Sequence, residues 1–138
     1  MKKLVAFIVI ILLVGASSEQ TLKKGAVISI NYITFVLKPD VPLYEFVDFM
    51  IKKHIPEFEK SFPGVKEYLL WGDKGVNKYQ LAVMEVYGSV AMRDKYWKDV
   101  DVPTDEGISA KEKMEPLFYE TFNYLEDFDV ETIQWIIK

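Results

Sequence analysis

The sequence contains no cysteine and a single histidine, His54. Without cysteine no disulfide bond can form, and one imidazole cannot supply the nitrogen and sulfur ligands of an ordinary zinc site. The sequence also contains neither a glycine-rich phosphate-binding loop nor the Gly-x-Ser-x-Gly motif of many hydrolases. We therefore expect no metal site and no cofactor, and a fold that is stabilised by an apolar core or by a second copy of the chain.

Long apolar runs are also absent, since the longest, Leu4–Val14, has eleven residues. As a helix it would extend about 16 Å, roughly half the hydrocarbon thickness of a membrane. Two lysines precede this run and small residues up to Ala16 follow it, which is the pattern of a signal peptide. We expect residues 1–16 to be a signal peptide and residues 17–138 to be a single exported domain, periplasmic or secreted. An uncleaved membrane anchor is the alternative.

Basic residues are outnumbered by acidic ones. The chain has 17 Lys and Arg against 21 Asp and Glu, and without Lys2 and Lys3 the expected mature domain has 15 against 21, a net charge of −6. Nucleic acids and anionic membranes both bind through a basic face. We therefore expect no nucleic-acid partner, and no membrane association after removal of the signal peptide.

The rest of the chain is patterned as strands and helices. β-Branched and aromatic residues crowd the strand candidates, and apolar residues recur at spacings of three and four in the helix candidates. The expected strands are residues 26–36, 65–71, 79–87 and 132–137. The expected helices are residues 42–62, with a kink at Pro56, a short helix from Ser89 to about Trp97, and a helix that begins at a Ser109–Glu112 capping box.

The order strand, helix, strand, strand, helix, strand is typical of an α+β, ferredoxin-like β-α-β-β-α-β fold. In this fold a four-stranded antiparallel sheet carries both helices on one face. The first strand places apolar residues on both of its faces, namely Val27, Ile33 and Phe35 on one and Ile28, Ile30 and Val36 on the other. Strands of this kind are covered on both sides, so we expect a homodimer in which two sheets form a shared barrel.

Several short segments resemble one superfamily. They are the Lys38-Pro39-Asp40 turn, Lys53-His54-Ile55-Pro56, Phe62-Pro63-Gly64-Val65 and Arg93-Asp94-Lys95-Tyr96. With the element order they resemble the dimeric α/β-barrel superfamily, which includes antibiotic-biosynthesis monooxygenases and stress-responsive A/B barrel proteins. The hairpin Gly72-Asp73-Lys74-Gly75-Val76-Asn77 is similar to that of uncharacterised exported members. The resemblance implies a ligand between helices and sheet, and chemistry such as cofactor-independent oxygenation or isomerisation.

Three residues are the main candidates for a site. His54 lies on the apolar stripe of the first helix, where it is either a core residue or an acid–base group beside a cavity. Asn31 interrupts an apolar strand, and the resemblance implies that Asn31 and Trp97 help to form a ligand pocket. Haem-degrading members use a histidine on a later helix as iron ligand, and this chain has none after His54, which disfavours that activity.

Aromatic residues supply further candidates for the pocket. Tyr68, Trp71 and Tyr96 are expected to bind a ligand, although such residues also form cores and interfaces. The acidic residues Asp99, Asp101, Asp105 and Glu106 could hold a hard cation, but their spacing lacks the pattern of a calcium loop and favours a solvated loop or a lid.

Two functions remain open on the sequence alone. One is an exported domain that binds a small apolar or aromatic ligand, or acts on it as a cofactor-independent monooxygenase or isomerase with His54 as the proton-transfer group. The other is a non-catalytic stress-response or assembly homodimer in which side chains fill the space between helix and sheet. A cavity at His54 favours the first, and close packing there favours the second.

Overall fold

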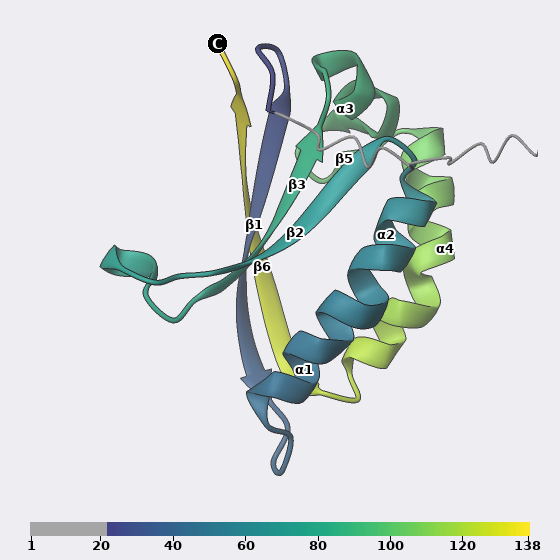
Figure 1. Ribbon diagram of the computed structural model, residues 1–138. Coiled ribbons are helices and arrows are strands. Elements are labelled where there is room, and N and C mark those ends of the chain that lie inside the picture. The colour runs from purple at the N-terminus through teal and green to yellow at the C-terminus, as the bar shows by residue number, and fades with distance from the viewer. Residues whose placement is uncertain (1–21) are drawn as a thin grey trace, which may run out of the picture.

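The computed structural model describes residues 22–138, and the expected signal peptide at residues 1–16 lies outside this range. The described chain forms two layers, a sheet and a set of helices that cover only one of its faces (Figure 1). The strands of the main sheet are β1 (Val27–Leu37), β2 (Val65–Trp71), β3 (Leu81–Tyr87) and β6 (Leu125–Ile136). Within residues 22–138, no helix is both long and apolar enough to cross a membrane.

The sheet has the strand order β2-β3-β1-β6, and each neighbouring pair is antiparallel. The two central strands β1 and β3 are therefore separated in sequence by the first helical segment and by β2. The edge strands β2 and β6 each follow a helical segment. This topology confirms the expected ferredoxin-like α+β fold, with four antiparallel strands and helices on one face.

The first helical segment contains a wide turn in its middle. It consists of α1 (Leu43–Phe49), the π-helical turn η1 (Met50–His54) and α2 (Ile55–Ser61). The Ile55 N–H donates to the Met50 carbonyl, five residues earlier, where an α-helix would use a residue four earlier. Pro56 has no N–H and therefore cannot donate a hydrogen bond to a carbonyl of the preceding turn. The helix distortion expected at this proline lies in the turn just before it. His54 is the last residue of the wide turn.

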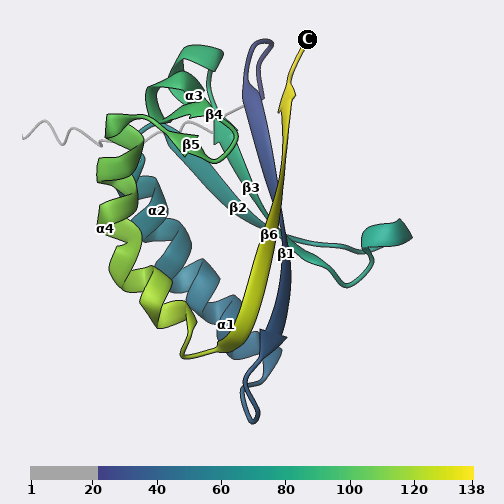
Figure 2. The same ribbon diagram turned by 180° about the vertical axis from the view of Figure 1, so that it is seen from behind.

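The β2–β3 hairpin extends beyond the sheet on the side opposite the helices (Figures 1 and 2). Its tip contains the short 3-10 helix η2 (Gly75–Asn77). Gly75 adopts a positive φ of 77°, which suits glycine at this turn. Val76 at the tip is completely exposed. After β3, α3 (Val90–Tyr96) begins as expected at Ser89, whose side chain accepts a hydrogen bond from the Met92 N–H.

The last helix begins earlier than predicted. α4 spans Asp105–Thr121, and the Thr104 hydroxyl accepts the Gly107 N–H at its start, so Ser109 and Glu112 do not form the N-terminal capping box. Asp105 and Glu106 lie in the first helical turn, where negative charge is favourable. Glycine is required at position 107, because an added Cβ would lie 2.1 Å from the Tyr96 carbonyl oxygen.

Two further expectations about loops were wrong. Part of the predicted acidic loop is a small hairpin of β4 (Trp97–Asp99) and β5 (Val102–Pro103), with Asp101 at a positive φ of 59° between them. The final strand begins at Leu125, well before residue 132. Acidic residues alternate with apolar ones along part of β6, and such charges are usual on an edge strand.

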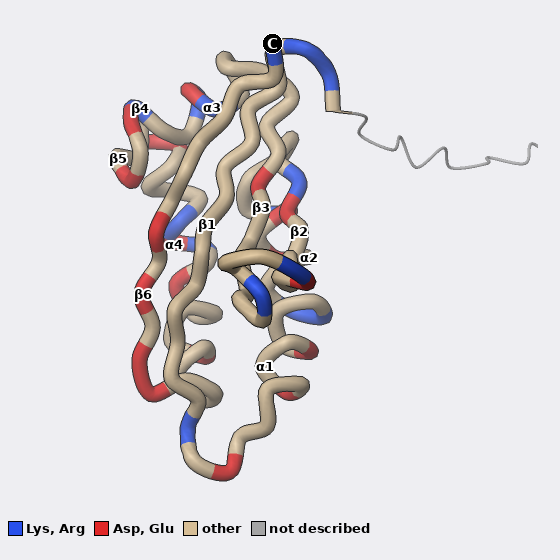
Figure 3. Tube along the Cα trace, turned by 90° about the vertical axis from the view of Figure 1, so that its left-hand side faces the viewer, with Lys and Arg blue, Asp and Glu red and all other residues tan. Residues whose placement is uncertain are grey.

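The two faces of the sheet differ in what covers them. Two core clusters, one around Phe62 and one around Phe46, pack between the helices and the sheet. The opposite side, which we call the open face, carries alternate residues of each strand. These are mostly apolar, as the prediction for β1 required: Ile28, Ile30, Tyr32, Tyr68, Leu70, Ala82, Met84, Val86, Ile133 and Trp135. Figure 3 looks onto this face and shows that β1 contributes no charge to it.

Candidate functional site

A cavity of 790 Å³ lies between the helices and the sheet. Residues of η1, α2 and α4 form one wall, and residues of all four sheet strands contribute to the other, with Trp97 at one end. Its lining is mainly apolar and aromatic, including Ile33, Phe46, Met50, Phe58, Phe62, Val83, Met114, Phe118, Leu125 and Phe128. The polar side chains in this lining include Asn31, His54, Glu67 and Glu85.

Two glutamates face each other across neighbouring strands inside this cavity. Glu67 of β2 and Glu85 of β3 are direct partners in the antiparallel register, on the face covered by the helices. Glu67 is buried, with 4% of its surface exposed, and Glu85 is partly buried. Like charges at directly opposed positions destabilise a sheet, so this pair opposes the stability of the fold. An arrangement of this cost is characteristic of a functional site.

A chain of hydrogen bonds fixes the Glu85 carboxyl group. The Tyr87 hydroxyl donates to Glu85 Oε2 at 2.5 Å, and the Asn31 amide donates to Glu85 Oε1 at 2.8 Å. Tyr87 in turn accepts the Trp97 indole N–H at 2.9 Å, and the Thr132 hydroxyl donates to Asn31 Oδ1 at 2.8 Å. Both oxygens of Glu85 therefore accept hydrogen bonds from side chains that are themselves hydrogen-bonded, which fixes the orientation of the carboxyl group.

His54 contacts the other glutamate. Its Nδ1 lies 3.2 Å from Glu67 Oε2, and its ring packs between Phe49 and Phe58, with centroid distances of 6.4 and 6.5 Å. The π-helical turn gives the imidazole this position. The cavity therefore holds a His54–Glu67 pair beside the hydrogen-bonded Glu85.

Burial changes the acidity of these groups. Removal from water raises the pKa of Glu85 to about 7; the hydrogen bonds from Tyr87 and Asn31 oppose this rise, and the charge of Glu67 adds to it. Burial also raises the pKa of Glu67, against the hydrogen bond with His54. Burial and the Glu85 charge raise the pKa of Tyr87, which therefore stays a hydrogen-bond donor. Near neutral pH, Glu85 can both accept and release a proton.

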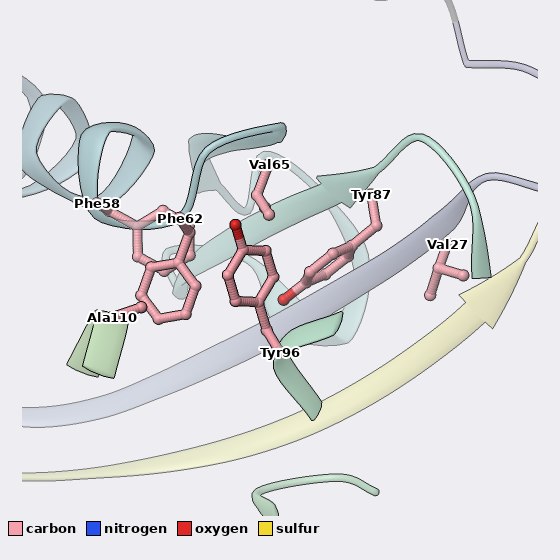
Figure 4. Close-up of a cluster of buried hydrophobic side chains, with 7 residues drawn as sticks. All are labelled: Val27, Phe58, Phe62, Val65, Tyr87, Tyr96 and Ala110. Atoms are coloured by element: carbon pink, nitrogen blue, oxygen red, sulfur yellow. The ribbon is translucent and has the colours of Figure 1, made fainter. Parts of the chain in front are cut away.

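The structure brings together three of the predicted site residues, and it places the other three elsewhere. His54, Asn31 and Trp97 line the cavity. Tyr68 lies on the open face, because it alternates with Glu67 along β2. Trp71 is half exposed and lines a second hollow of 560 Å³ beside α1. Tyr96 is a core residue whose hydroxyl donates to the Pro63 carbonyl at 2.9 Å, packed against Phe62 (Figure 4).

The sequence interpretation did not identify Glu67, Glu85 or Tyr87 as site residues. A signal for the first two exists: Glu67 lies between Val65 and Leu69 at alternate positions of β2, so a carboxylate occupies the face that is otherwise apolar. Glu85 similarly stands between Val83 and Tyr87. A charged residue on the buried face of a strand indicates a buried polar group.

No protein-family model and no curated protein matches this sequence. Solved structures do match. A dimeric protein of unknown function with a ferredoxin-like fold, from Bacteroides fragilis, is 16% identical with a TM-score of 0.39; the match covers 81% of this chain and 98% of that one. A NIPSNAP family protein from Agrobacterium tumefaciens is 11% identical, with a TM-score of 0.47 and coverages of 78% and 90%. A candidate antibiotic biosynthesis monooxygenase from Bacteroides thetaiotaomicron is 15% identical, with a TM-score of 0.37 and coverages of 77% and 85%.

Proposed function

We propose that this chain is an exported domain that binds one small, largely apolar ligand in the cavity and moves a proton on it. The observation that carries the proposal is the pair of opposed carboxyl groups, Glu67 and Glu85, inside an apolar cavity. Isomerisation by proton transfer fits this site best, because it needs a group that can take up and return a proton near neutral pH, as Glu85 can. A base removes a proton from one atom of the ligand, and the resulting acid returns a proton to another.

The size and lining of the cavity support binding. Small-molecule sites in proteins have volumes of about 300–1,000 Å³ and combine apolar walls with a few convergent polar groups. The cavity at 790 Å³ lies within this range, and Asn31, Glu67 and Glu85 lie on its sheet side. This open volume at His54 favours the ligand-binding function over the alternative in which the protein's own side chains fill the space.

Each polar residue receives a role from its contacts. Glu85 is the group that takes and returns the proton, since its pKa of about 7 keeps both forms populated at neutral pH. Asn31 and Tyr87 orient it through their hydrogen bonds. His54, which was the predicted catalytic residue, contacts Glu67 through Nδ1 at 3.2 Å and is the second acid–base group.

The proposal can be tested with 2-tetralone, an apolar aromatic ketone whose protons next to the carbonyl group exchange with solvent when a base removes them. In deuterated water at pH 7.5, a setting close to the Glu85 pKa, we expect the protein to accelerate deuterium incorporation, followed by NMR. Glu85→Gln should lower the protein-catalysed rate by about 100-fold or more, because the amide cannot accept the proton.

Glu126→Gln is the matched control for this experiment. Glu126 is exposed on β6 and does not line the cavity, so its replacement should leave the exchange rate unchanged. Equal rates for Glu85→Gln and the unchanged protein would contradict the assignment of Glu85 as the base.

Homodimer formation through the open face is part of the same proposal. No helix of the described chain covers this face, and Tyr68, Ile133 and Trp135 are 43%, 37% and 61% exposed there. The β2–β3 hairpin extends on the same side and ends in the fully exposed Val76 (Figure 2). A second copy would bury both features at once, and exposed apolar areas of this kind usually mark an interface.

A lysine at the centre of the open face should separate the subunits. Ile30 lies between Met84 and Ile133 in the sheet register, so Ile30→Lys would place a charge within the interface. Light scattering at micromolar concentration should give twice the mass of one chain for the unchanged protein and close to one chain for Ile30→Lys. Ile108→Lys, an exposed position on α4, is the control. A folded single chain without any substitution would disprove the dimer.

Export remains supported by the sequence alone. The two lysines, the short apolar run and the small residues before position 17 have the order of a signal peptide. Mass spectrometry of the protein from its source should find an N-terminus at Ser17 if cleavage follows Ala16.

A further inference from the structure

The polar side of the cavity contains more hydrogen-bond acceptors than donors. Glu67 is almost completely buried, and its Oε2 contacts His54. Its second oxygen, Oε1, accepts no hydrogen bond from any residue in the described range 22–138. Glu85 lies directly opposite and uses one bond at each oxygen, although a carboxylate can accept more. This oxygen borders the cavity and, unlike Ser61 Oγ, is not closed off from it, so a group inside the cavity can donate a hydrogen bond to it.

The charged residues that line the cavity also favour a ligand that donates hydrogen bonds. Two carboxyl groups and one imidazole face the sheet side of the cavity, and among its described lining residues the only lysine or arginine is Lys111, which is exposed on α4. Lys111 accompanies Glu112 and Glu115 of the same helix in the lining, so the α4 side is not basic either. The cavity therefore favours a positive group over a negative one.

The walls near the carboxyl groups suit a cation as well. Phe58, Phe62 and Trp97 line the cavity and form a continuous aromatic group, with Phe62 stacked on Phe58 at 4.5 Å and on Trp97 at 6.2 Å. Aromatic faces attract ammonium groups and also hold an apolar ring. An ammonium group has three N–H donors and no acceptor, which complements a site of this composition.

We infer that the ligand is an apolar, ring-sized amine whose protonated nitrogen lies between Glu67 and Glu85. This inference rests on the proposed function, because it assigns a chemical class to the ligand of the same cavity. The ammonium group donates to Glu67 Oε1 and to Glu85, and the ring occupies the space along Phe58 and Phe62. Binding would offset the repulsion between the two carboxylates, which are opposed in the sheet.

Three probes that share a naphthalene ring test the inference. They are 1-naphthylmethylamine, which is cationic at pH 8, 1-naphthalenemethanol, which is neutral, and 1-naphthoic acid, which is anionic. Isothermal titration of the purified protein should show that the amine binds about tenfold or more tightly than the alcohol, because charge-assisted hydrogen bonds are about twice as strong as neutral ones. The acid should bind most weakly.

Glu67→Gln tests the contribution of the Glu67 charge to binding separately from that of the apolar cavity. It should lower the affinity for the amine by about tenfold, because the ion pair becomes a neutral hydrogen bond, and leave the affinity for the alcohol within threefold. Retained binding of the alcohol also shows that the variant is folded. Glu57→Gln, a partly exposed position on α2 that does not line the cavity, is the matched control and should change neither affinity.

The outcomes distinguish the inference from the function on which it rests. If the alcohol binds as tightly as the amine, or if Glu67→Gln leaves the amine affinity unchanged, the cavity binds apolar rings but the amine class is wrong. If none of the three probes binds, the ligand-binding function itself is contradicted and this inference falls with it.

Discussion

Replacing Phe62 by alanine is expected to lower the free energy of unfolding by about 3–5 kcal/mol, the usual cost of removing a buried aromatic ring. Phe62 is 2% exposed and follows the last residue of α2. Its ring contacts Phe58, Tyr96 and Trp97, with centroid distances of 4.5, 5.1 and 6.2 Å. These partners come from three elements, so the ring joins α2, α3 and the start of β4, and no single neighbour can move to fill the space.

Urea unfolding followed by circular dichroism measures this effect. Since small domains have stabilities of about 5–15 kcal/mol, the variant should unfold at a much lower urea concentration or be partly unfolded without urea. Phe118→Ala removes the same ring from a half-exposed position on α4 and should cost far less. A similar loss in both variants would mean that the Phe62 cluster is not a centre of the core.

The second large effect is a loss of stability as the pH rises. The pKa of Glu85 is raised in the folded protein from its ordinary value of 4.5 to about 7. Between these values the folded state holds a proton that the unfolded state has released, so the stability contributed by the neutral carboxyl is lost as pH increases. It is fully present below pH 4.5 and absent well above pH 7, and the difference amounts to about 3 kcal/mol. The raised pKa of Glu67 acts in the same direction.

Glu85→Gln should remove most of this pH dependence, because an amide does not titrate. The free energy of unfolding would be measured in urea at pH 5 and at pH 8 for the unchanged protein, Glu85→Gln and Glu126→Gln. The unchanged protein and Glu126→Gln should be less stable at pH 8, and Glu85→Gln should differ little between the two values. If all three proteins lose the same stability, Glu85 is not the group responsible.

The sequence predicted the order and type of the main elements because each carries a local signal. Proline and glycine separate β1 from the first helical segment and that segment from β2, and the spacing of apolar residues identifies the helix. The errors occurred where local signals compete with packing. Ser109 and Glu112 match a capping box, yet the helix begins at Asp105, where the Thr104 hydroxyl caps it and Gly107 fits closely against the Tyr96 carbonyl group.

The candidate site was harder to predict, because its groups meet only in the folded sheet. Asn31 and His54 were noticed as polar residues in apolar segments, which is a property of the sequence alone. The alternation along each strand marks Glu67 and Glu85 separately as carboxylates on an apolar face, but their pairing depends on the register between β2 and β3, which no local pattern gives. Two aromatic candidates lie outside the cavity for different reasons. Tyr68 lies on the open face because of its position along β2, and Tyr96 lies in the core because α3 packs it against Phe62.

The extra residue in the turn Met50–His54 has an evolutionary consequence. A residue added to an α-helix rotates everything after it by about 100°, since one turn takes 3.6 residues. Phe46 and Phe49 precede this insertion and pack into the core, whereas His54 ends it and borders the cavity. A chain with one residue fewer here would keep Phe46 and Phe49 in the core and point a different side chain at the carboxylates. Single-residue insertions and deletions are therefore a short route by which related chains could exchange the imidazole for another group and acquire a new specificity.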